Sequence, residues 1–278
     1  MFNKTLRRCG LLAVAGALLM AGCGQMNQAK PISTVSIKGQ QCLKFPVVED
    51  EDGPMYMSNN YELTWPAQGA VGKEVELEMI RVCFGDSTAT TFDQALTKWR
   101  MGWHLWFDAN AEGEPIDSSA MAEPWGNIDL RSYLEQSGRL ATFTVASDVF
   151  HTKAAHGVHD VAYLMVDRDK DKVVHLADLM DTTHLAAAIY KAVSELDTNS
   201  SVKDCINEEY LDGNPLPLSQ NFFIDSARHS IVIVYELYRI APYPAGIQSV
   251  VLPIDWLAKE VVLTPYAKNL FGISDSQE

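Results

Sequence analysis

The sequence predicts an α+β fold of mainly antiparallel sheets with helices packed on one face, arranged as two successive modules. Three observations predict it. Short segments alternate apolar and polar residues, as strands do; other segments place apolar residues three and four apart, as helices do; and strands are followed by helices twice along the chain. We place the first module at residues 34–134 and the second at residues 135–278.

In the first module, the clearest elements are one strand and one helix. Tyr56 to Trp65 has the alternation of a strand, and Pro66 ends it as in an edge or first strand. Lys73 to Phe84 has one apolar helical face, and Gly85 follows at the position of a helix C-cap. We therefore expect a strand followed by a helix in the first module.

A second helix is expected from Thr91 to about Phe107. Trp99, Trp103 and Trp106 are spaced four and three residues apart, which places them on one side of it. Such a stripe is able to form a platform for a sugar. We expect instead that it is buried in the core, because tryptophan side chains carry a large apolar area.

The second module begins with an expected antiparallel pair of strands, Leu140 to Phe150 and His159 to Val166, joined by the loop 151–158. The charged run Asp167 to Lys172 is acidic but lacks the spacing of a calcium-binding loop, so we interpret it as a solvated hairpin turn.

Helices and then strands complete this module. Two helices are expected, Thr183 to Leu196 with Thr182 or Thr183 as its cap, and Ser201 to Leu211. Three strands and a last helix should follow: Asn221 to Ile224, Ile231 to Tyr238, Ser249 to Leu252, and, after Pro253, a helix from Asp255 to about Val262.

The first 23 residues, MFNKTLRRCGLLAVAGALLMAGC, have the pattern of a signal peptide. The apolar stretch after the basic start is about eleven residues, short of the roughly 20 that a membrane-spanning helix needs. Met20-Ala21-Gly22-Cys23 is similar to the bacterial lipobox. The resemblance implies that residues 1–22 are removed and that Cys23 carries a diacylglyceryl group and a further acyl chain such as palmitate, with residues 23–33 as a tether.

The lipobox resemblance also implies a location. Gly24 follows Cys23 where retention in the inner membrane usually requires aspartate. For a Gram-negative host this implies anchoring in the outer membrane, facing the periplasm. The membrane is therefore the first partner that we expect.

The chain is strongly acidic, with a net charge of −14. Loss of residues 1–22 would remove Lys4, Arg7 and Arg8 and no carboxylate, which takes the net charge to −17. Such a charge repels nucleic acid and favours cationic partners. Nucleic-acid binding is therefore excluded.

Three cysteines remain after Cys9 leaves with the signal and Cys23 is lipidated: Cys42, Cys83 and Cys205. In an oxidising compartment they allow at most one disulfide, and the three possible pairings stay open. Their spacing does not support a zinc site.

Two passages carry a family resemblance. They are Thr152-Lys153-Ala154-Ala155-His156-Gly157 with the downstream Tyr163 to Asp167 and Val174 to Met180, and Val232 to Leu252 containing Tyr238-Arg239-Ile240-Ala241-Pro242-Tyr243-Pro244-Ala245-Gly246. In order and spacing they resemble the extracytoplasmic family of unknown function shared with the ectodomain of the lysozyme-sensing anti-sigma factor RsiV and the peptidoglycan deacetylase PdaC.

This resemblance covers residues 135–263, and Tyr61 to Gly85 looks like the small partner domain of the same family. Lys153, Ala154 and Asp171 stand where the family has glycine, and Pro244 replaces a small residue. A backbone that needs positive φ would be strained by the lysine or the alanine, so this loop is expected to take another path. The resemblance implies an extracytoplasmic recognition module and no known reaction.

The residues that we select as a binding site are His156, Gly157, Tyr238, Tyr243 and Gly246. Tyrosines among prolines and glycines present rigid contact area at low entropic cost, which suits recognition. The simpler alternative is that Pro and Gly only turn the corner between strands while Tyr235, Tyr238 and Tyr243 pack against the core. Both interpretations stay open.

An alternative site is the cluster His151, His156, His159 and Asp160, which has the residue types of a hydrolytic metal centre. Neighbours in a strand point to opposite faces, so a polar hairpin loop is the preferred interpretation. The sequence also lacks the G-x-S-x-G and H-E-x-x-H motifs of hydrolases.

We therefore expect a lipid-anchored, non-catalytic recognition module for a cationic, lysozyme-like protein or a cell-wall glycan, without metal or cofactor. The alternatives are an envelope glycan-modifying enzyme that uses the His151 to Asp160 cluster, and a structural or assembly lipoprotein.

Overall fold

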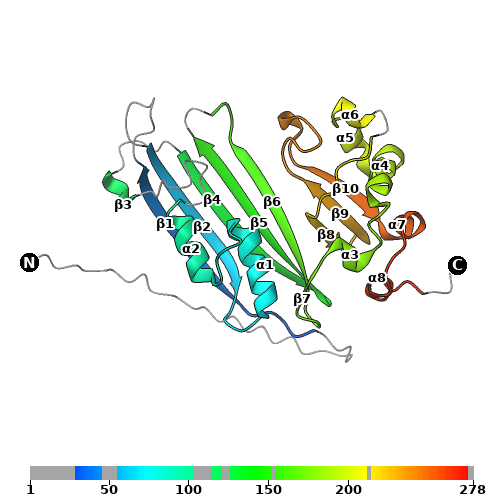
Figure 1. The fold of residues 1–278 in the computed structure, drawn as a ribbon, viewed down its shortest axis with the longest axis horizontal. Coiled ribbons are helices and arrows are strands. Elements are labelled where there is room, and N and C mark those ends of the chain that lie inside the picture. The colour runs from blue at the N-terminus through cyan, green and yellow to red at the C-terminus, as the bar shows by residue number, and fades with distance from the viewer. Residues whose placement is uncertain are drawn as a thin grey trace, which may run out of the picture.

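The computed structural model describes residues 29–45, 55–102, 114–120, 126–151, 154–211 and 214–274. Within them, two sheets carry separate helices and lie next to each other (Figure 1). The expected α+β class, with mainly antiparallel sheets, helices on one face and two modules, is confirmed. The signal peptide, Cys23, Trp103 and Trp106 lie outside the described residues.

The larger sheet has seven strands in the order β3-β1-β2-β4-β5-β6-β7. Neighbouring strands are antiparallel except for the parallel pair β2 and β4. The strands are β1 (Thr34–Phe45), β2 (Met55–Pro66), β3 (Glu114–Ile116), β4 (Gly126–Ser137), β5 (Leu140–His151), β6 (Val158–Asp167) and β7 (Lys172–Val174), with a short 3-10 turn η1 (Ser118–Ala120) between β3 and β4.

Helices α1 (Lys73–Phe84) and α2 (Phe92–Arg100) cover one face of this sheet (Figure 1). Trp65 of β2 is buried under them, with ring centroids 4.6 Å from Phe92 and 5.5 Å from Phe143. α1 has the predicted bounds, and Gly85 caps it at φ 67°. α2 begins after Thr91 as expected but ends at Arg100, and its Trp99 is buried.

The smaller sheet has the order β10-β9-β8 and carries most of the remaining helices (Figure 1). Its strands are β8 (Phe222–Asp225), β9 (Ser230–Tyr235) and β10 (Gln248–Pro253). The helices are α3 (Leu176–Leu179), α4 (Leu185–Glu195), α5 (Ser200–Lys203), α6 (Glu208–Leu211), α7 (Ile254–Glu260) and α8 (Pro265–Phe271), with the 3-10 turns η2 (Asp197–Asn199) and η3 (Tyr243–Ala245).

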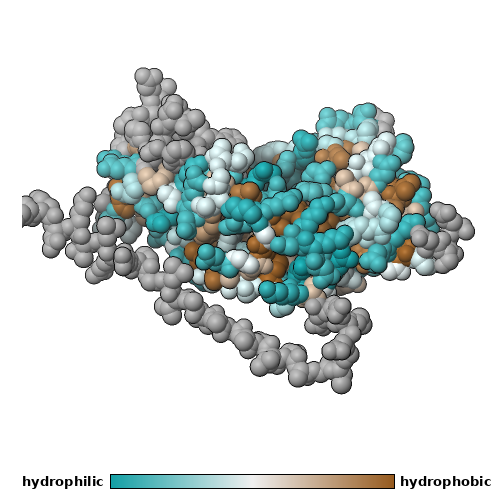
Figure 2. Space-filling view, turned by 60° about the horizontal axis from the view of Figure 1, so that its bottom comes forward, coloured by the Kyte–Doolittle hydropathy of each residue, from teal (hydrophilic) through white to brown (hydrophobic). Residues whose placement is uncertain are grey.

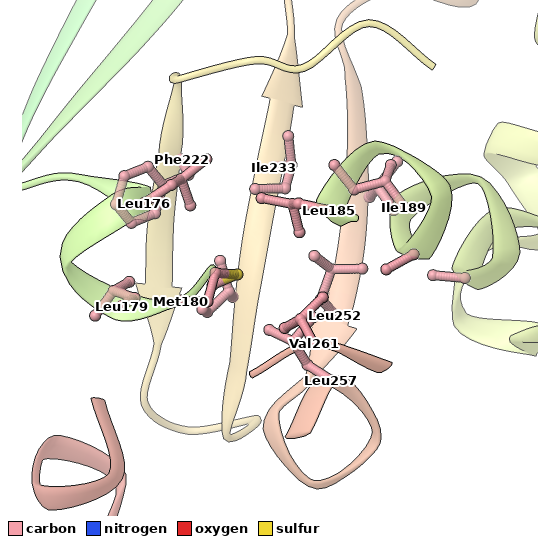
Figure 3. Packing of buried hydrophobic residues seen from close by; sticks show 14 of the residues in the cluster. Leu176, Leu179, Met180, Leu185, Ile189, Phe222, Ile233, Leu252, Leu257 and Val261 are labelled. Carbon is pink, nitrogen blue, oxygen red and sulfur yellow. The ribbon is translucent and has the colours of Figure 1, made fainter. Parts of the chain in front are cut away.

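Aliphatic side chains hold these helices on the smaller sheet. Leu176 of α3 lies beside Phe222 of β8, and Leu185 of α4 lies over Ile233 of β9 (Figure 3). Each of these side chains is buried. Their burial removes apolar area from water and supplies the main stabilisation of this layer.

Strands β1 and β4 were not predicted, because polar residues interrupt their buried rows. The inward row of β1 contains Gly39 and Gln41, and that of β4 contains Ser132. Gly39 is required there, because a Cβ would lie 2.2 Å from the hydroxyl oxygen of Tyr61. The predicted module boundary at 134/135 falls inside β4; the two sheets instead divide the chain after β7.

Four smaller predictions are corrected. The helix expected at 201–211 is broken, because the Asn207 N–H donates to the Ile240 carbonyl and α5 and α6 form separately. Strand β9 ends at Tyr235 rather than Tyr238. The N-cap of α4 is His184, not Thr182 or Thr183. Residues 29–33, predicted as tether, lie on the protein, with Ile32 buried.

Side chains of Asn221 and Asp167 help to join the two sheets. Asn221, before β8, accepts from the Tyr163 N–H at 2.9 Å and donates to the Val161 carbonyl at 2.7 Å. Asp167 at the end of β6 accepts from Arg139 and from the Tyr266 hydroxyl of α8. The second contact corrects the expected solvated turn, because Asp167 is only 1% exposed.

The surface away from these joints is mostly polar. On the face in Figure 2, hydrophobic residues form small patches separated by hydrophilic ones. No helix in the described part of the chain is long and apolar enough to span a membrane.

Candidate functional site

Two loops meet where the ends of the two sheets approach each other. His156 comes from the β5–β6 loop, and Tyr243 comes from η3 after β9. Their rings stack with centroids 3.5 Å apart at 18°, and the Tyr243 hydroxyl donates to the Gly157 carbonyl at 2.6 Å. Residues that are 86 positions apart in the sequence are thus in direct contact.

Tyr238 adds an exposed ring to this contact. Its hydroxyl is 3.0 Å from Nε2 of His156, and its ring centroid is 5.6 Å from that of Tyr243. The side chain is 58% exposed, and the backbone has φ 65°, a left-handed conformation that is uncommon for an aromatic residue. The loop therefore holds Tyr238 toward solvent rather than in the core.

The two glycines set the backbone of these loops. Gly246 has φ 74° and ψ −165°, a conformation that is essentially restricted to glycine. A Cβ on Gly157 would lie 3.2 Å from the Val149 carbonyl oxygen, closer than side chains normally approach. Both residues therefore position the loops, and the tyrosines provide the surface.

All five residues selected from the sequence are brought together in this region. The competing interpretation, that the tyrosines pack against the core, holds for Tyr235, which is buried. It does not hold for Tyr238. Tyr243 is half-buried between the two loops.

Two exposed apolar residues adjoin the loops, and sequence reasoning missed them. Phe150 is 45% exposed and Val158 is 47% exposed. The Gly157 backbone lies against Phe150, because a Cβ there would be 3.9 Å from Cδ2 of that ring. Phe150 stands in the row of Thr142, Thr144 and Ala146, so an aromatic residue in a polar row was the available signal. Val158 is paired with Val149, so its side chain lies on the opposite face of the sheet from Phe150. We call Phe150, His156, Tyr238 and Tyr243 the tip surface.

A charged group lies beside the tip surface. His159 and Arg131 both contact the Asp148 carboxylate. A Cβ on Gly157 would lie 4.0 Å from Nε2 of His159, so this ring is close to the loop. Partial burial raises the pKa of Asp148, but hydrogen bonds from His159 and Arg131 outweigh it and lower the pKa overall. Asp148 is therefore a carboxylate whose charge is matched by its neighbours.

The proposed metal cluster does not converge. His156 is stacked on Tyr243, His159 pairs with Asp148, and the Asp160 carboxylate accepts from the Val161 N–H. The side chain of His151 lies outside the described residues. Among those that are described, no three His, Cys, Asp or Glu side chains are placed to hold a metal ion.

Ser200 and Lys203 have the spacing of the S-x-x-K motif, in which the serine is a catalytic nucleophile. The Lys203 ammonium donates to the Ser194 carbonyl at 2.9 Å. Its hydrogen bond is therefore made to the backbone of α4.

The three cysteines are not paired with one another. Cys42 and Cys83 are buried and Cys205 is half-buried, all as free thiols, so the structure contains none of the three possible disulfides. Burial raises the pKa of the Cys83 thiol well above its usual value. That cysteine is a packed core residue of α1.

Comparison with known proteins gives one family match and two structural likenesses. No curated protein matches the sequence. A DUF3298 family protein from Pseudomonas aeruginosa is 17% identical, with a TM-score of 0.50, and the alignment covers 86% of this chain and 97% of that one. One from Bacteroides fragilis is 15% identical, with a TM-score of 0.57, and coverage of 90% and 100%. At these identities the likeness shows the fold alone.

The family match covers residues 178–255, which contain α4, the whole smaller sheet and the tip-surface residues Tyr238 and Tyr243. The kinship with RsiV and PdaC stays a prediction. Residues 178–255 thus match the model of the family described as protein of unknown function (DUF3298).

Proposed function

We propose that this protein is a lipid-anchored protein of the outer membrane, facing the periplasm, and that it binds a cationic, lysozyme-like protein through the tip surface. The observation that carries the proposal is the convergence of His156, Tyr238 and Tyr243 from two distant loops, next to the exposed ring of Phe150. Exposed apolar groups gathered in one place are typical of protein-binding sites.

The shape of the tip surface suits a protein partner. Tyrosine is enriched at the energetic centres of interfaces, because it presents a large rigid area and a polar end. The stack of His156 on Tyr243 fixes the loops before binding. A preformed surface loses less conformational entropy on association than a flexible one.

The charge of the chain supports a cationic partner. A net charge of −17 after signal cleavage attracts a basic protein from a distance and speeds its association. The family resemblance points to the same class of partner, because a relative in that family senses lysozyme. The lipobox supports the location, since acylated Cys23 would hold the domain at the membrane.

A glycan-modifying enzyme gains no support from the described part of the alternative cluster, in which His156, His159 and Asp160 face different partners. We therefore do not assign a reaction to this region.

The test is a binding titration with the full lipidated chain, purified in a polyoxyethylene detergent, against a cationic lysozyme. We expect Tyr238→Ala to raise the Kd at least tenfold, which corresponds to about 1.4 kcal/mol. Because the Tyr238 side chain is exposed, its removal should leave the fold intact, which circular dichroism checks.

A matched pair of variants separates the tip surface from general stickiness. Phe150→Asn replaces an exposed ring of the tip surface, and Val158→Asn replaces an equally exposed valine on the opposite face of the same hairpin. We expect only Phe150→Asn to weaken binding. Equal effects of the two variants, or no lysozyme binding at low salt, would contradict the proposal.

A further inference from the structure

A groove separates the uncovered face of the larger sheet from the smaller sheet. It has a volume of about 510 Å³. Its floor is formed by β4, β5 and β6 on the face opposite α1 and α2, and its wall is formed by β8 and the turn after it. It shares no residue with the tip surface.

Aromatic rings line this groove at three points. Tyr133 of β4 is 47% exposed, and Tyr163 of β6 lies against Phe223 of β8 with ring centroids 4.6 Å apart at 38°. On this face of β4, the residues on either side of Tyr133 are the charged Arg131 and Glu135. The Tyr133 ring is therefore not part of a hydrophobic core. These rings offer flat apolar area to a ligand.

Hydroxyl groups and one carboxylate stand between the rings. Thr142 and Thr144 form the floor, with Glu135 and Ser226 at the rim. Thr144 and Glu135 make no side-chain hydrogen bond to any described residue, whereas Thr142 donates to the sulfur of Met165. Burial raises the pKa of the Tyr163 phenol, and the nearby Glu135 charge raises it further, so this phenol keeps its proton.

The charged residues that line the groove indicate which ligands it does not attract. Its lining residues include no Lys, Arg or His. Of its two carboxylates, Asp225 already accepts from the N–H groups of Ala227 and Arg228. Anionic ligands therefore find no cation here, and only Glu135 remains to attract a positive charge.

The groove is also elongated. A second hollow of about 260 Å³ adjoins it and shares Leu140, Ile224 and Asp225 among its lining residues. This hollow is also lined by Arg139, which is paired with Asp167, and by His229, which lies 3.8 Å from Asp255. A chain-like ligand fits such a shape better than a compact one does.

We infer that this groove binds a neutral oligosaccharide. A pyranose ring has a C–H face that packs on aromatic rings and a rim of hydroxyls that pair with hydroxyl and carboxylate groups, and the groove offers both. The role is separate from lysozyme binding at the tip surface, and either can fail without the other.

The experiment is isothermal titration of the full chain with two neutral probes, the β-1,4-linked tetramer of N-acetylglucosamine and cellotetraose. A polyoxyethylene detergent is required, because sugar-headed detergents would compete. We expect saturable binding of at least one probe. Tyr133→Ala should weaken it at least tenfold, and Thr144→Val, which keeps the side-chain shape, should weaken it severalfold.

Tyr238→Ala is the control, and it should leave the affinity for the oligosaccharide unchanged while reducing lysozyme binding. Failure of both neutral probes to bind at millimolar concentration overturns the inference. So does binding that survives both Tyr133→Ala and Thr144→Val, or a preference for tetralysine over both sugars. If Tyr133→Ala does not fold, Thr144→Val decides alone.

Discussion

Among the described residues, Asp167 is the one buried acid. Two nitrogens of Arg139 lie 2.6 and 2.9 Å from its Oδ2, the Tyr266 hydroxyl lies 2.9 Å away, and the N–H groups of Asp169 and Lys170 bond to its other oxygen. Burial alone would raise the pKa of Asp167, but these donors outweigh burial and lower it. One carboxylate thus joins the β4–β5 turn, the end of β6 and α8.

A carboxyl whose folded-state pKa is below its unfolded value stabilises the fold at pH values above the unfolded value, about 3.9. This contribution is lost as the pH falls through the lower, folded-state pKa. We predict that Asp167→Asn lowers the free energy of unfolding by about 3 kcal/mol at pH 7, because Arg139 loses its charged partner. The loss should shrink on acidification, as measured by urea unfolding at pH 7 and pH 3.

The matched control for that prediction is Asp169→Asn. Asp169 is half-exposed, and its carboxylate lies 3.7 Å from Nε of Arg139. Its replacement should change stability by less than about 1 kcal/mol. Equal losses in the two variants would show that burial of the Asp167 contact is not what stabilises the joint.

The hydroxyls of Tyr243 and Tyr238 allow a second comparison at the residue scale. Tyr243→Phe removes the half-buried hydrogen bond to the Gly157 carbonyl, so we predict a loss of about 1 kcal/mol in the free energy of unfolding. Tyr238→Phe removes an exposed hydrogen bond and should cost much less. Thermal unfolding of both variants checks the order, and the reverse order would contradict the geometry.

At the scale of elements, strong local signals were enough for α1 and for the β5–β6 hairpin. The apolar face of α1 ends at a glycine that adopts positive φ, and β5 alternates between buried and half-buried residues from Ala141 to Ala146. β1 and β4 were not predicted, because Gly39, Gln41 and Ser132 interrupt the apolar residues on the side of each strand that faces the core. α8 was also missed, although Thr264 caps it and Pro265 opens it, which is a recognisable start signal.

Asp171 differs from the resembling family in a turn between two strands. It stands in the β6–β7 turn where the resembling family has glycine, and its φ is 50°. Aspartate adopts this conformation more readily than most residues. The turn therefore keeps a left-handed residue without glycine.

The open edge of β6 gives a prediction at the same scale. β7 pairs only with Met165 to Asp167, and the Asn221 side chain bonds to the backbone of Val161 and Tyr163 farther along. Asn221→Ala should lower the free energy of unfolding by about 2 kcal/mol, since two backbone groups lose their partner.

Hydrogen exchange should report that change at the amide of Tyr163, which would exchange faster in Asn221→Ala. Asn214→Ala serves as the control, because its side chain makes one exposed bond to the Glu209 carbonyl. Unchanged exchange at Tyr163 would mean that Asn221 does not hold the edge.

For the whole molecule, sequence reasoning selected His156, Tyr238 and Tyr243 but missed Phe150 of the tip surface. His156 and Tyr238 are 82 residues apart, and nothing local in either loop specifies that the two sheets bring them together. Their contact depends on packing between the sheets, to which the side chains of Asn221 and Asp167 contribute. Phe150 adjoins the site from its own hairpin, next to Gly157.

The acidic charge and the proposed lipid anchor give predictions at this scale. Cys23→Ser should move the protein from the membrane fraction to the soluble periplasm and abolish palmitate labelling. Retention of the label would contradict lipidation at Cys23. Labelling in cells followed by fractionation measures both.

Binding to lysozyme should also weaken as salt increases. A chain of net charge −14, or −17 after the proposed signal cleavage, attracts a basic protein through interactions that are screened over about 8 Å at physiological salt. We expect the association rate to fall severalfold between 50 and 300 mM salt, as measured by stopped-flow mixing. An association rate that does not depend on salt would contradict the claim that electrostatic attraction speeds binding.

The central claim is that the tip surface is where a cationic protein binds, and hydrogen–deuterium exchange of the full chain with and without lysozyme tests it most directly. The account predicts slower exchange in both contributing loops, residues 154–160 and 236–246, while the face covered by α1 and α2 stays unchanged. Protection confined to other segments, or unchanged exchange in both loops under conditions where lysozyme is bound, would contradict it.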